Sequence, residues 1–532
     1  MLGAMQDWEL RVTGLIDHAA REHGDREIVT HWADGTQSRT NWREVRRDAL
    51  KMVQALRRLG LQPQDRVATL AMNHSRHLVT WYGAPGAGCV LHTINPRLFD
   101  DQLGFIINHA EDRVLIYDAA FQPIVDRLRP LCPGIEHYIC FDSHEHAPAF
   151  DDWIGAEDGE AQWTSGDERD PCMLCYTSGT TGHPKGVLYS HRSNMLHTLA
   201  MIGTSCLALE PRSCVLPIVP MFHANNWGMP WGCAATGAKL VYSQVNDPSA
   251  LCALIEKEQV SHVAGVPTVW FAFLQHLDET GKDMPPIAYA ISGGAAFPRS
   301  VVERLMRSGV RVGHAWGMTE TSPIATVSYE GADWDALSFD EQVDRKCLQG
   351  RVVYGSEVRI VSLDDHETLL PHDGTTSGAL QVRGHWTIRR YFKTEEDASD
   401  EQGWFDTGDV ATILPDGSVR LTDRTKDVIK SGGEWISSVE LENAAVGHPD
   451  VVEAAAIGVA HPKWDERPIL IVVPRGGSNV CGEDVREFLR DKVASWWLPD
   501  AVELVSSLPH TGTGKISKKD LRVQFKDYTL PR

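Results

Sequence analysis

The stretch YTSGTTGHPKG, residues 176–186, follows a short apolar run and combines glycines, hydroxyl side chains and a lysine. Backbone N–H groups and hydroxyls in such a loop can hold phosphate oxygens, and the lysine adds positive charge. A Walker-type loop would place the lysine directly after its last glycine. Here Lys185 follows a histidine and a proline instead. The stretch therefore predicts a phosphate loop of another class.

Helical and strand patterns alternate on both sides of this loop. Residues 41–60 have the apolar spacing of an amphipathic helix. Short apolar runs with the composition of buried strands occur at 66–72, 113–118, 137–141, 239–244, 261–267, 287–294 and 310–317. The later runs end in glycine, proline or small polar residues, and ligands in such folds gather at the carboxyl ends of strands.

The pattern of expected secondary structure changes twice in the rest of the chain. From about residue 350 to 421, short strands and turns predict a small β subdomain. Beyond it, helix, strand, strand and helix patterns predict a separate piece. The expected fold class is α/β: a large N-terminal domain, residues 1–423, has two layered α/β subdomains plus the small β subdomain. A small α+β C-terminal domain, residues 424–532, follows, and the resemblance described below implies that it is mobile.

Composition limits the kinds of partner. The chain has 532 residues, a formal net charge of -21 and eleven scattered cysteines. The charge argues against nucleic acid and anionic membranes as partners, and no apolar stretch predicts a transmembrane segment. The cysteines favour reduced thiols, and the pair Cys172 and Cys175 is interpreted as part of a buried strand. We expect a cytoplasmic protein that acts on small molecules.

Further segments carry candidate chemistry. WGMTET, residues 316–321, offers an aromatic ring, a threonine for phosphate and a carboxylate for magnesium. WFDTGD, residues 404–409, ends in an aspartate that could accept ribose hydroxyls. DRTKDVIKSGGEWI, residues 423–436, joins a charged turn to a glycine pair, and PHTGTGKISKKDLR, residues 509–522, places Lys515 in a glycine-rich loop.

In this order, and over nearly the whole chain, these segments resemble the acyl-adenylate-forming superfamily of acyl-CoA synthetases, luciferases and peptide-synthetase adenylation domains. The resemblance implies that ATP activates a carboxylic acid to an acyl-AMP with Mg²⁺ present. CoA then accepts the acyl group, and AMP and pyrophosphate are released. The segments HTINPRLF, VPMFHANNWG and KWDERP are most similar to the branch of medium-chain fatty-acyl-CoA and methylmercaptopropionate-CoA ligases.

The same resemblance assigns the nucleotide site. Lys515 would bridge the incoming carboxylate and the α-phosphate, and Thr319 would contact that phosphate. Glu320 would hold Mg²⁺ together with Thr180. Asp409 would bind the ribose hydroxyls. The other expected nucleotide-binding residues are Thr177, Ser178, Gly179, Thr181, Gly182, Lys185, Gly293, Gly294, Ala295, Ala296, Trp316, Gly317, Met318 and Arg424.

A second group of residues would serve the transfer to CoA. In the family the small domain rotates between the half-reactions about a hinge, which corresponds here to Lys426. The loop that would then line the pantetheine tunnel comprises Lys430, Gly432, Gly433, Glu434 and Trp435. Dimers are common in the family, so a homodimer is possible.

The acid pocket is expected to include His223, Asn226, Trp227, Val266 and Pro267. The bulk of Trp227 favours a bounded pocket, against very long chains. A buried amide at Asn226 needs a polar partner. A hydroxycinnamate such as ferulate would supply one, whereas a bond to the backbone would leave the pocket to a medium-chain fatty acid. Both acids stay open at this point.

Two other activities fit the same motifs. One is an adenylation enzyme that loads a stand-alone carrier protein, and the other is a luciferase-like oxidase of the adenylate.

Overall fold

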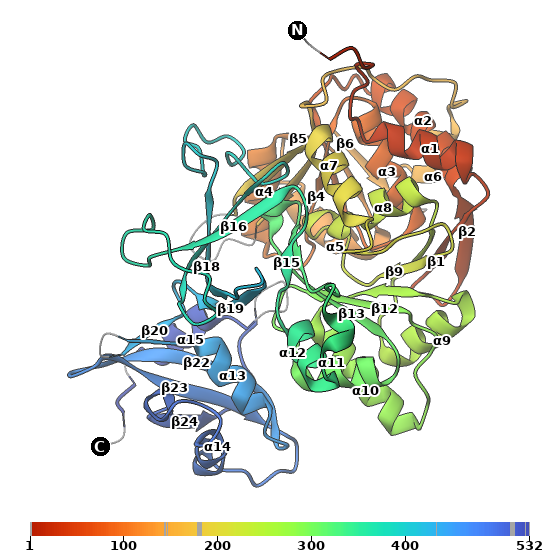
Figure 1. Cartoon of the computed structure of the whole chain (residues 1–532). Helices are drawn as coiled ribbons and strands as arrows, with labels where there is room; N and C mark the ends of the chain where they lie inside the picture. Colours follow the sequence, from red (N-terminus) through yellow and green to blue (C-terminus); the bar gives the residue numbers. More distant parts are fainter. Residues whose placement is uncertain are drawn as a thin grey trace. The chain divides into compact units, whose positions relative to one another are not determined.

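The computed structural model describes residues 3–142, 145, 147–177, 184–431, 434–510, 516–526 and 528–530. Contacts divide the chain into two compact units (Figure 1). The first comprises residues 1–357 and 383–405, and the second comprises residues 358–382 and 406–532. The expected α/β class is confirmed, because parallel sheets and helices alternate along most of the first unit.

A six-stranded sheet in the first unit carries the phosphate loop. Its strand order is β6-β5-β3-β4-β7-β8, and only β8 runs antiparallel to its neighbour. The strands are β3 (Arg66–Leu70), β4 (Val90–Thr93), β5 (Asp112–Tyr117), β6 (His137–Cys140), β7 (Pro171–Tyr176) and β8 (Gly186–Ser190). The associated helices are α2 (Trp42–Arg58), α3 (Ser75–Gly86), α4 (Asp100–Ala110), α5 (Gln122–Leu128) and α6 (Phe150–Gly155). The predicted helix α2 begins after Asn41, whose side chain accepts a bond from the Glu44 N–H.

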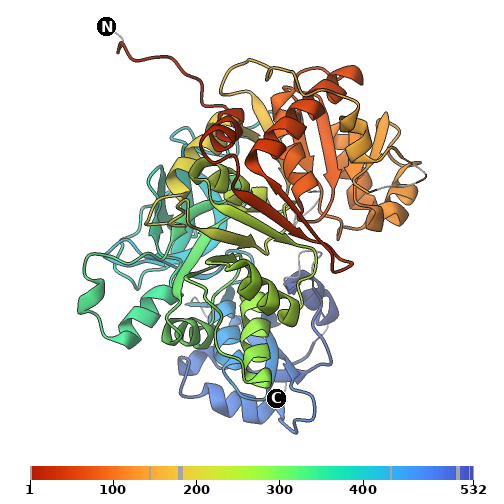
Figure 2. The ribbon, with the colours of Figure 1, turned by 90° about the vertical axis from the view of Figure 1, so that its right-hand side faces the viewer.

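A nine-stranded sheet with the order β15-β14-β13-β12-β11-β9-β10-β1-β2 completes the first unit. Its strands are β1 (Glu27–His31), β2 (Gln37–Asn41), β9 (Cys214–Pro217), β10 (Lys239–Ser243), β11 (His262–Ala264), β12 (Tyr289–Gly293), β13 (Arg311–Gly317), β14 (Ile324–Val327) and β15 (Arg351–Val352). Figure 2 shows the β1–β2 hairpin beside the later strands, and β1 pairs in parallel with β10. The amino-terminal strands thus belong to the sheet built from residues 214–352.

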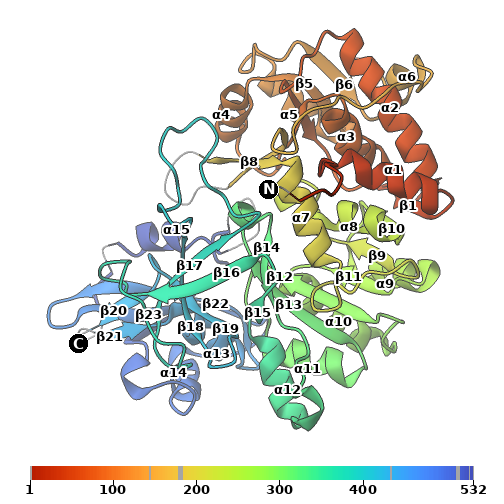
Figure 3. The ribbon, with the colours of Figure 1, turned by 45° about the horizontal axis from the view of Figure 1, so that its top comes forward.

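Helices cover the nine-stranded sheet because their apolar faces share its core. The helices are α1 (Thr13–Glu22), α7 (His191–Met201), α8 (Met229–Thr236), α9 (Pro248–Glu258), α10 (Pro267–Thr280), α11 (Arg299–Arg307) and α12 (Phe339–Cys347). Figure 3 shows α10, α11 and α12 beside β12 and β13. Trp270 of α10 and Val302 of α11 pack with Leu216 and Val312 of the strands. This packing holds the carboxyl ends of the strands in one row.

The second unit contains two sheets. A four-stranded sheet has β16 (Ser356–Val361), β17 (Gly378–Gly384), β18 (Phe405–Ile413) and β19 (Val419–Arg424). A five-stranded sheet has β20 (Ile429–Ser431), β21 (Glu434–Ile436), β22 (Val451–His461), β23 (Asp465–Pro474) and β24 (Ala501–Leu504). Ala454 and Ala456 of β22 pack with α13 (Ser438–Val446) and α14 (Gly482–Leu489), whereas Ala455 and Ile457 pack toward α15 (Lys518–Gln524). Short 3-10 turns occur at Ala119–Phe121, Trp334–Ala336 and Ser495–Trp497.

One local expectation was confirmed. Cys172 and Cys175 are buried in β7, as predicted. Over the residues that the structure describes, no cluster of three or more His, Cys, Asp or Glu could hold a metal ion. In the same residues no helix is long and apolar enough to cross a membrane.

A buried lysine links α12 to the segment after β14. Lys346 is only 1% exposed, and its side-chain ammonium donates a hydrogen bond to the Ser328 carbonyl at 3.0 Å. Glu330 lies 3.4 Å from the ammonium, and the Trp334 ring centre lies 4.8 Å from it. Burial lowers the pKa of Lys346 to about 8. The negative charge of Glu330 acts in the opposite direction and raises this pKa, whereas the positive charge of Arg311 lowers it further.

The contribution of Lys346 to stability should therefore rise with pH in one window. The ordinary pKa of Lys346 is 10.5, so between its folded value of about 8 and that value the unfolded chain binds more protons. The Lys346→Met variant should lack this part of the rise. Urea unfolding of both proteins at about pH 8 and about pH 10 measures the difference. The exposed Lys519→Met variant is the control and should keep the wild-type rise; identical pH dependence for the Lys346 variant would contradict the assignment.

Candidate functional site

The two ends of the predicted phosphate loop are held together. The Thr177 N–H donates to the Lys185 carbonyl at 2.9 Å, and the Lys185 N–H donates to the Thr177 hydroxyl at 3.4 Å. The loop therefore begins directly after β7 and ends directly before β8, and its two ends lie side by side. The predicted loop residues Ser178, Gly179, Thr180, Thr181 and Gly182 lie outside the described residues.

The predicted phosphate and metal residues lie near Lys185. Thr319 and Glu320 stand in a short 3-10 turn, Thr319–Thr321, after β13. The Tyr189 hydroxyl donates to the Thr319 carbonyl at 2.7 Å, which ties this turn to β8. Glu320 is 6% exposed and accepts a bond from the Tyr391 hydroxyl at 2.8 Å. The Lys185 ammonium lies 4.7 Å from the centre of the Tyr391 ring.

Burial and the neighbouring Glu320 carboxylate raise the pKa of the Tyr391 hydroxyl. The phenol therefore keeps its proton at neutral pH and donates it to the carboxylate. The structure thus connects Lys185 and Glu320 through one tyrosine, a residue that sequence reasoning missed. Tyr391 follows Arg389 and Arg390 in a charged stretch, which is typical of an exposed segment, so the local sequence did not indicate a functional role.

The predicted nucleotide-binding residues Gly293, Gly294, Ala295 and Ala296 lie at the end of β12 and directly after it. Gly294 has a φ of +80°, which favours glycine. A methyl group added at Gly293 would lie 2.8 Å from the Ala315 carbonyl, so β12 and β13 come too close there for a side chain. His314 of β13 is buried, and its ring nitrogens lie 2.9 Å from the Cys347 carbonyl and 3.3 Å from the Ala295 carbonyl. The loop that contains Ala295 and Ala296 is therefore tied to the end of α12.

The residues after β13 are equally constrained. Trp316 is buried in β13, and Met318 donates its N–H to the Pro323 carbonyl at 3.1 Å. A methyl group added at Gly317 would lie 1.7 Å from the same carbonyl oxygen, so only glycine fits there. This turn places Thr319 and Glu320 at the carboxyl end of the strand.

A left-handed turn contains two of the predicted acid-pocket residues, Asn226 and Trp227. The turn Ala224–Gly228 has positive φ angles throughout, and they are 37°, 57°, 49°, 52° and 76°. This conformation costs roughly 1–2 kcal/mol per residue for side chains other than glycine, although asparagine tolerates it better. Asn225 and Asn226 are fully buried here. Asn225 donates to the Asn194 side chain at 3.3 Å, which anchors the turn to α7.

Asn226 bonds to the backbone. Its amide group donates to the Val219 carbonyl, and its side-chain oxygen is buried without a hydrogen-bond partner in the described part of the chain. Of the two interpretations of this amide, the backbone bond is the one observed. The unpartnered oxygen is an acceptor only, so a ligand group would have to be a donor to satisfy it.

The pocket residues lie against the adenine residues. A methyl group added at Gly293 would lie 3.5 Å from the Trp227 ring, and one added at Gly294 would lie 3.8 Å from Val266. Pro267 opens α10 directly after Val266. His223 precedes the left-handed turn, with its ring centre 5.0 Å from that of Phe222. Trp227 and Val266 thus present apolar side chains near the two glycines.

In the second unit the two predicted ribose residues are paired. Asp409 of β18 and Arg424 of β19 face each other in register, and their side chains form an ion pair of 2.6 Å. Asp409 is 3% exposed, whereas the Arg424 side chain is 45% exposed. The guanidinium fixes the carboxylate and remains accessible to a further anionic group.

The predicted hinge follows β19. Lys426 is exposed. On one side of it, Asp423 accepts bonds from the backbone and hydroxyl of Ser438 in α13. On the other side, Asp427 pairs with Arg522 of α15 at 2.7 Å. The segment on either side of the hinge residue is thus tied to helices of the second unit.

The predicted CoA loop joins β20 to β21. The Lys430 ammonium lies 5.3 Å from the centre of the Trp435 ring. Ser431 of β20 is opposite Glu434 in the register of the antiparallel pair β20–β21. Gly432, Gly433 and the predicted catalytic Lys515 lie outside the described residues. Arg467 of β23, which sequence reasoning also missed, donates to the Ser431 hydroxyl at 3.1 Å and pairs with Asp500 at 2.7 Å. It holds the start of this loop.

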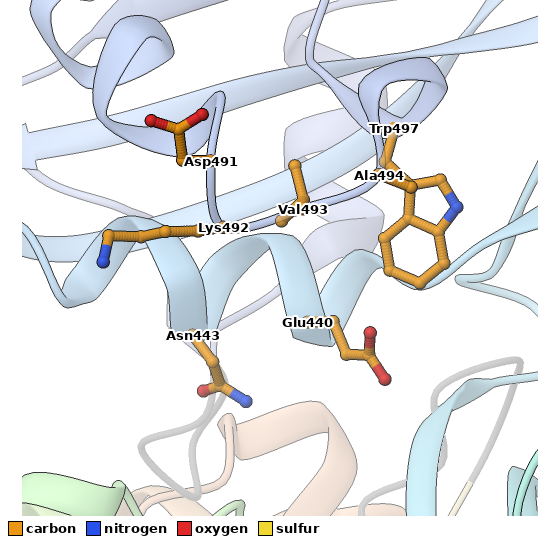
Figure 4. A pocket seen from close by; sticks show the side chains of 7 residues that line it. All are labelled: Glu440, Asn443, Asp491, Lys492, Val493, Ala494 and Trp497. Carbon is orange, nitrogen blue, oxygen red and sulfur yellow. The ribbon is translucent and has the colours of Figure 1, made fainter.

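A groove of about 630 Å³ lies elsewhere in the second unit. Figure 4 shows its lining side chains, which come from α13 and the segment after α14: Glu440, Asn443, Asp491, Lys492, Val493, Ala494 and Trp497. None of these is a predicted site residue.

The chain is similar to known proteins in sequence and in fold. Residues 16–392 match the model of the AMP-binding enzyme family, and residues 440–515 match the AMP-binding enzyme C-terminal domain. The chain is 47% identical to a 3-methylmercaptopropionyl-CoA ligase of Ruegeria lacuscaerulensis, over 99% of each chain. It is 44% identical to a medium-chain-fatty-acid–CoA ligase of Ectopseudomonas oleovorans, over 100% of this chain and 98% of that protein. A crystal structure of an anthranilate CoA ligase in complex with anthranoyl-AMP has a similar fold, with a TM-score of 0.86, 22% identity and coverage of 98% of this chain and 99% of that one.

The left-handed turn makes a prediction about stability. Asn226→Ala removes the bond to Val219 and places alanine at a φ of 49°, so we expect a loss of about 2 kcal/mol. Asn226→Gly removes the same bond without that strain and should lose about half as much. Urea unfolding of the three proteins measures both effects. A glycine variant less stable than the alanine variant would contradict the role of backbone strain.

Proposed function

Because this chain belongs to the AMP-binding enzyme family and is an AMP-forming acid–thiol ligase, we propose that its acid is methylmercaptopropionate or a medium-chain fatty acid. ATP, CoA and a carboxylic acid are its substrates. The proposal concerns which acid is chosen and which residues do the work.

The observation that carries the proposal is the position of the Trp227 ring, which would lie 3.5 Å from a methyl group added at Gly293. A large apolar ring beside a glycine forms a wall that suits an aliphatic chain of limited length. Val266 beside Gly294 extends the same apolar surface. The names of the two relatives point the same way, because one acts on methylmercaptopropionate and the other on medium-chain fatty acids.

Adenylation brings together two anions, the carboxylate of the acid and the triphosphate of ATP. Fixed positive charges and hydrogen-bond donors lower this barrier because negative charge accumulates on the α-phosphoryl group. In our proposal Lys185 and the loop of residues 177–182 hold the departing pyrophosphate, and Thr319 contacts the α-phosphate. Lys515 bridges the two reacting anions. The carboxylate of the acid is already ionised, so the step needs no general base.

The residues present fit a magnesium ion carried by ATP. Glu320 offers one buried carboxylate, and Mg²⁺ in such sites commonly binds one or two carboxylates together with substrate phosphates. Glu320 would hold the ion with the Thr180 hydroxyl, and the ion would neutralise phosphate charge. Glu320 is itself kept in place by the Tyr391 hydroxyl.

Transfer to CoA would use the second group of residues. We propose that residues 424–532 move as a C-terminal domain about Lys426, and that Asp409 and Arg424 hold the ribose. Lys430, Gly432, Gly433, Glu434 and Trp435 would then line the path of the pantetheine arm. Glycines suit a close backbone approach to a narrow ligand. A homodimer and a cytoplasmic location remain expectations from the sequence.

One observation favours a second acid. The buried, unpartnered oxygen of Asn226 would accept a hydrogen bond from a phenolic hydroxyl, as in ferulate. The hydroxycinnamate therefore stays as the second candidate substrate.

A panel of acids tests the choice. The protein is incubated with ATP, Mg²⁺ and CoA and with fatty acids of increasing length, methylmercaptopropionate or ferulate, and AMP release is measured. We expect kcat/KM to be highest for methylmercaptopropionate or a medium-chain fatty acid and to fall for long chains. The highest kcat/KM for ferulate, together with its selective loss in Asn226→Gly, would replace the proposal by the second candidate.

The role of Lys515 is tested by separating the half-reactions. Lys515→Ala should slow acyl-AMP formation by about 100-fold or more, because a cation at the developing charge is lost. Transfer from supplied acyl-AMP to CoA should be unchanged. The matched control is Lys519→Ala, which removes a nearby exposed lysine and should leave both rates as they are. Equal losses in both half-reactions of the Lys515 variant would contradict the assigned role.

A further inference from the structure

A short segment of the first unit, Ile388 to Phe392, runs between the start of β8 and the turn Thr319–Thr321, which contains Glu320. We call this segment the strap. At one end the Ile388 N–H donates to the Glu320 carbonyl at 2.7 Å. At the other end the Phe392 N–H donates to the Gly186 carbonyl at 2.8 Å. The strap therefore joins, through the backbone, the residue after Lys185 to the predicted metal ligand.

The strap fits closely against the start of β8. A methyl group added at Gly186 would lie 3.0 Å from the Phe392 side chain and 3.1 Å from Leu174. The absence of a side chain at Gly186 is thus what allows the strap to approach. The separation between Gly186 and Glu320 is set by the strap, a stretch of only five residues.

Tyr391 lies within the strap and contacts both functional side chains with different parts of its ring. Its hydroxyl donates to a Glu320 carboxylate oxygen at 2.8 Å, and its ring centre lies 4.7 Å from the Lys185 ammonium. The bond fixes one carboxylate oxygen, and the face of a phenol ring attracts a cation without neutralising it. Both charges thereby keep a defined position and remain usable by a nucleotide.

We propose that Tyr391 is a positioning residue for the adenylation half-reaction: its hydroxyl orients Glu320 toward the metal ion, and its ring places Lys185 toward the phosphates. The proposal rests on the roles given above to Glu320 and Lys185. It separates two functions in one side chain. The hydroxyl serves metal binding, and the ring serves nucleotide binding.

Two variants separate these functions. Tyr391→Phe removes only the hydroxyl, so the Mg²⁺ concentration for half-maximal adenylation should rise about 10-fold, as for other partners of metal ligands. The KM for ATP at saturating Mg²⁺ should stay near the wild-type value. Tyr391→Leu also removes the aromatic face, so its KM for ATP should rise about 5-fold in addition.

The measurements include one that does not depend on turnover. Binding of Mn²⁺ to the protein with a non-hydrolysable ATP analogue, followed by electron paramagnetic resonance, should weaken about 10-fold in Tyr391→Phe. Transfer from supplied acyl-AMP to CoA should be unchanged in both variants, and so should the melting temperature of Tyr391→Phe. The control is Tyr354→Phe, because Tyr354 is 91% exposed and should match the wild type throughout.

Two results would overturn the proposal. One is a wild-type Mg²⁺ requirement in Tyr391→Phe, and the other is an equal loss of both half-reactions, which a general structural role would produce. Failure of the proposed choice of acid is a different result, since it shows in the wild-type protein as a different order of acids on the panel. Mn²⁺ binding in the presence of the analogue requires no acid, so it tests Tyr391 in either case.

Discussion

The distance between two backbone hydrogen bonds sets the geometry of the candidate site. One joins Phe392 to Gly186 and the other joins Ile388 to Glu320. A single bond of this kind contributes only about 1 kcal/mol. Their effect is geometric, because five residues of chain have a limited reach and each bond has one direction. The start of β8 at Gly186 is therefore held at a fixed distance from Glu320.

Gly293 is a predicted nucleotide-binding residue that lies near the proposed acid-pocket residue Trp227. A methyl group added at this glycine would lie 2.8 Å from the Ala315 carbonyl of the next strand and 3.5 Å from the Trp227 ring. It would clash with the carbonyl, whereas its distance from the ring is that of an ordinary van der Waals contact. The Trp227 ring is in turn presented by a left-handed turn that Asn225 anchors to α7.

The sequence predicted the local elements and the places where strands end. The apolar runs before Gly293 and Gly317 became β12 and β13, because periodicity and glycine are local signals. Four features had no local signal. The pairing of β1 with β10 joins residues about two hundred positions apart, and the grouping of the four-stranded sheet with the C-terminal residues depends on long-range packing. Tyr391 acts through residues that are distant in the chain, and the partner of Asn226 depends on how the turn folds.

The place of β1 also has a consequence for the order in which the protein can be made. Ile28 and Val29 are among the first strand residues to leave the ribosome, yet their parallel partners Leu240 and Val241 follow much later. Until then β1 has only β2 to pair with, and a two-stranded hairpin is marginal in water. The six-stranded sheet contains residues 66–190, so it is complete before the other sheet gains its inner strands. The β1–β2 hairpin therefore lacks its partner strand β10 until after all strands of the six-stranded sheet have been synthesised.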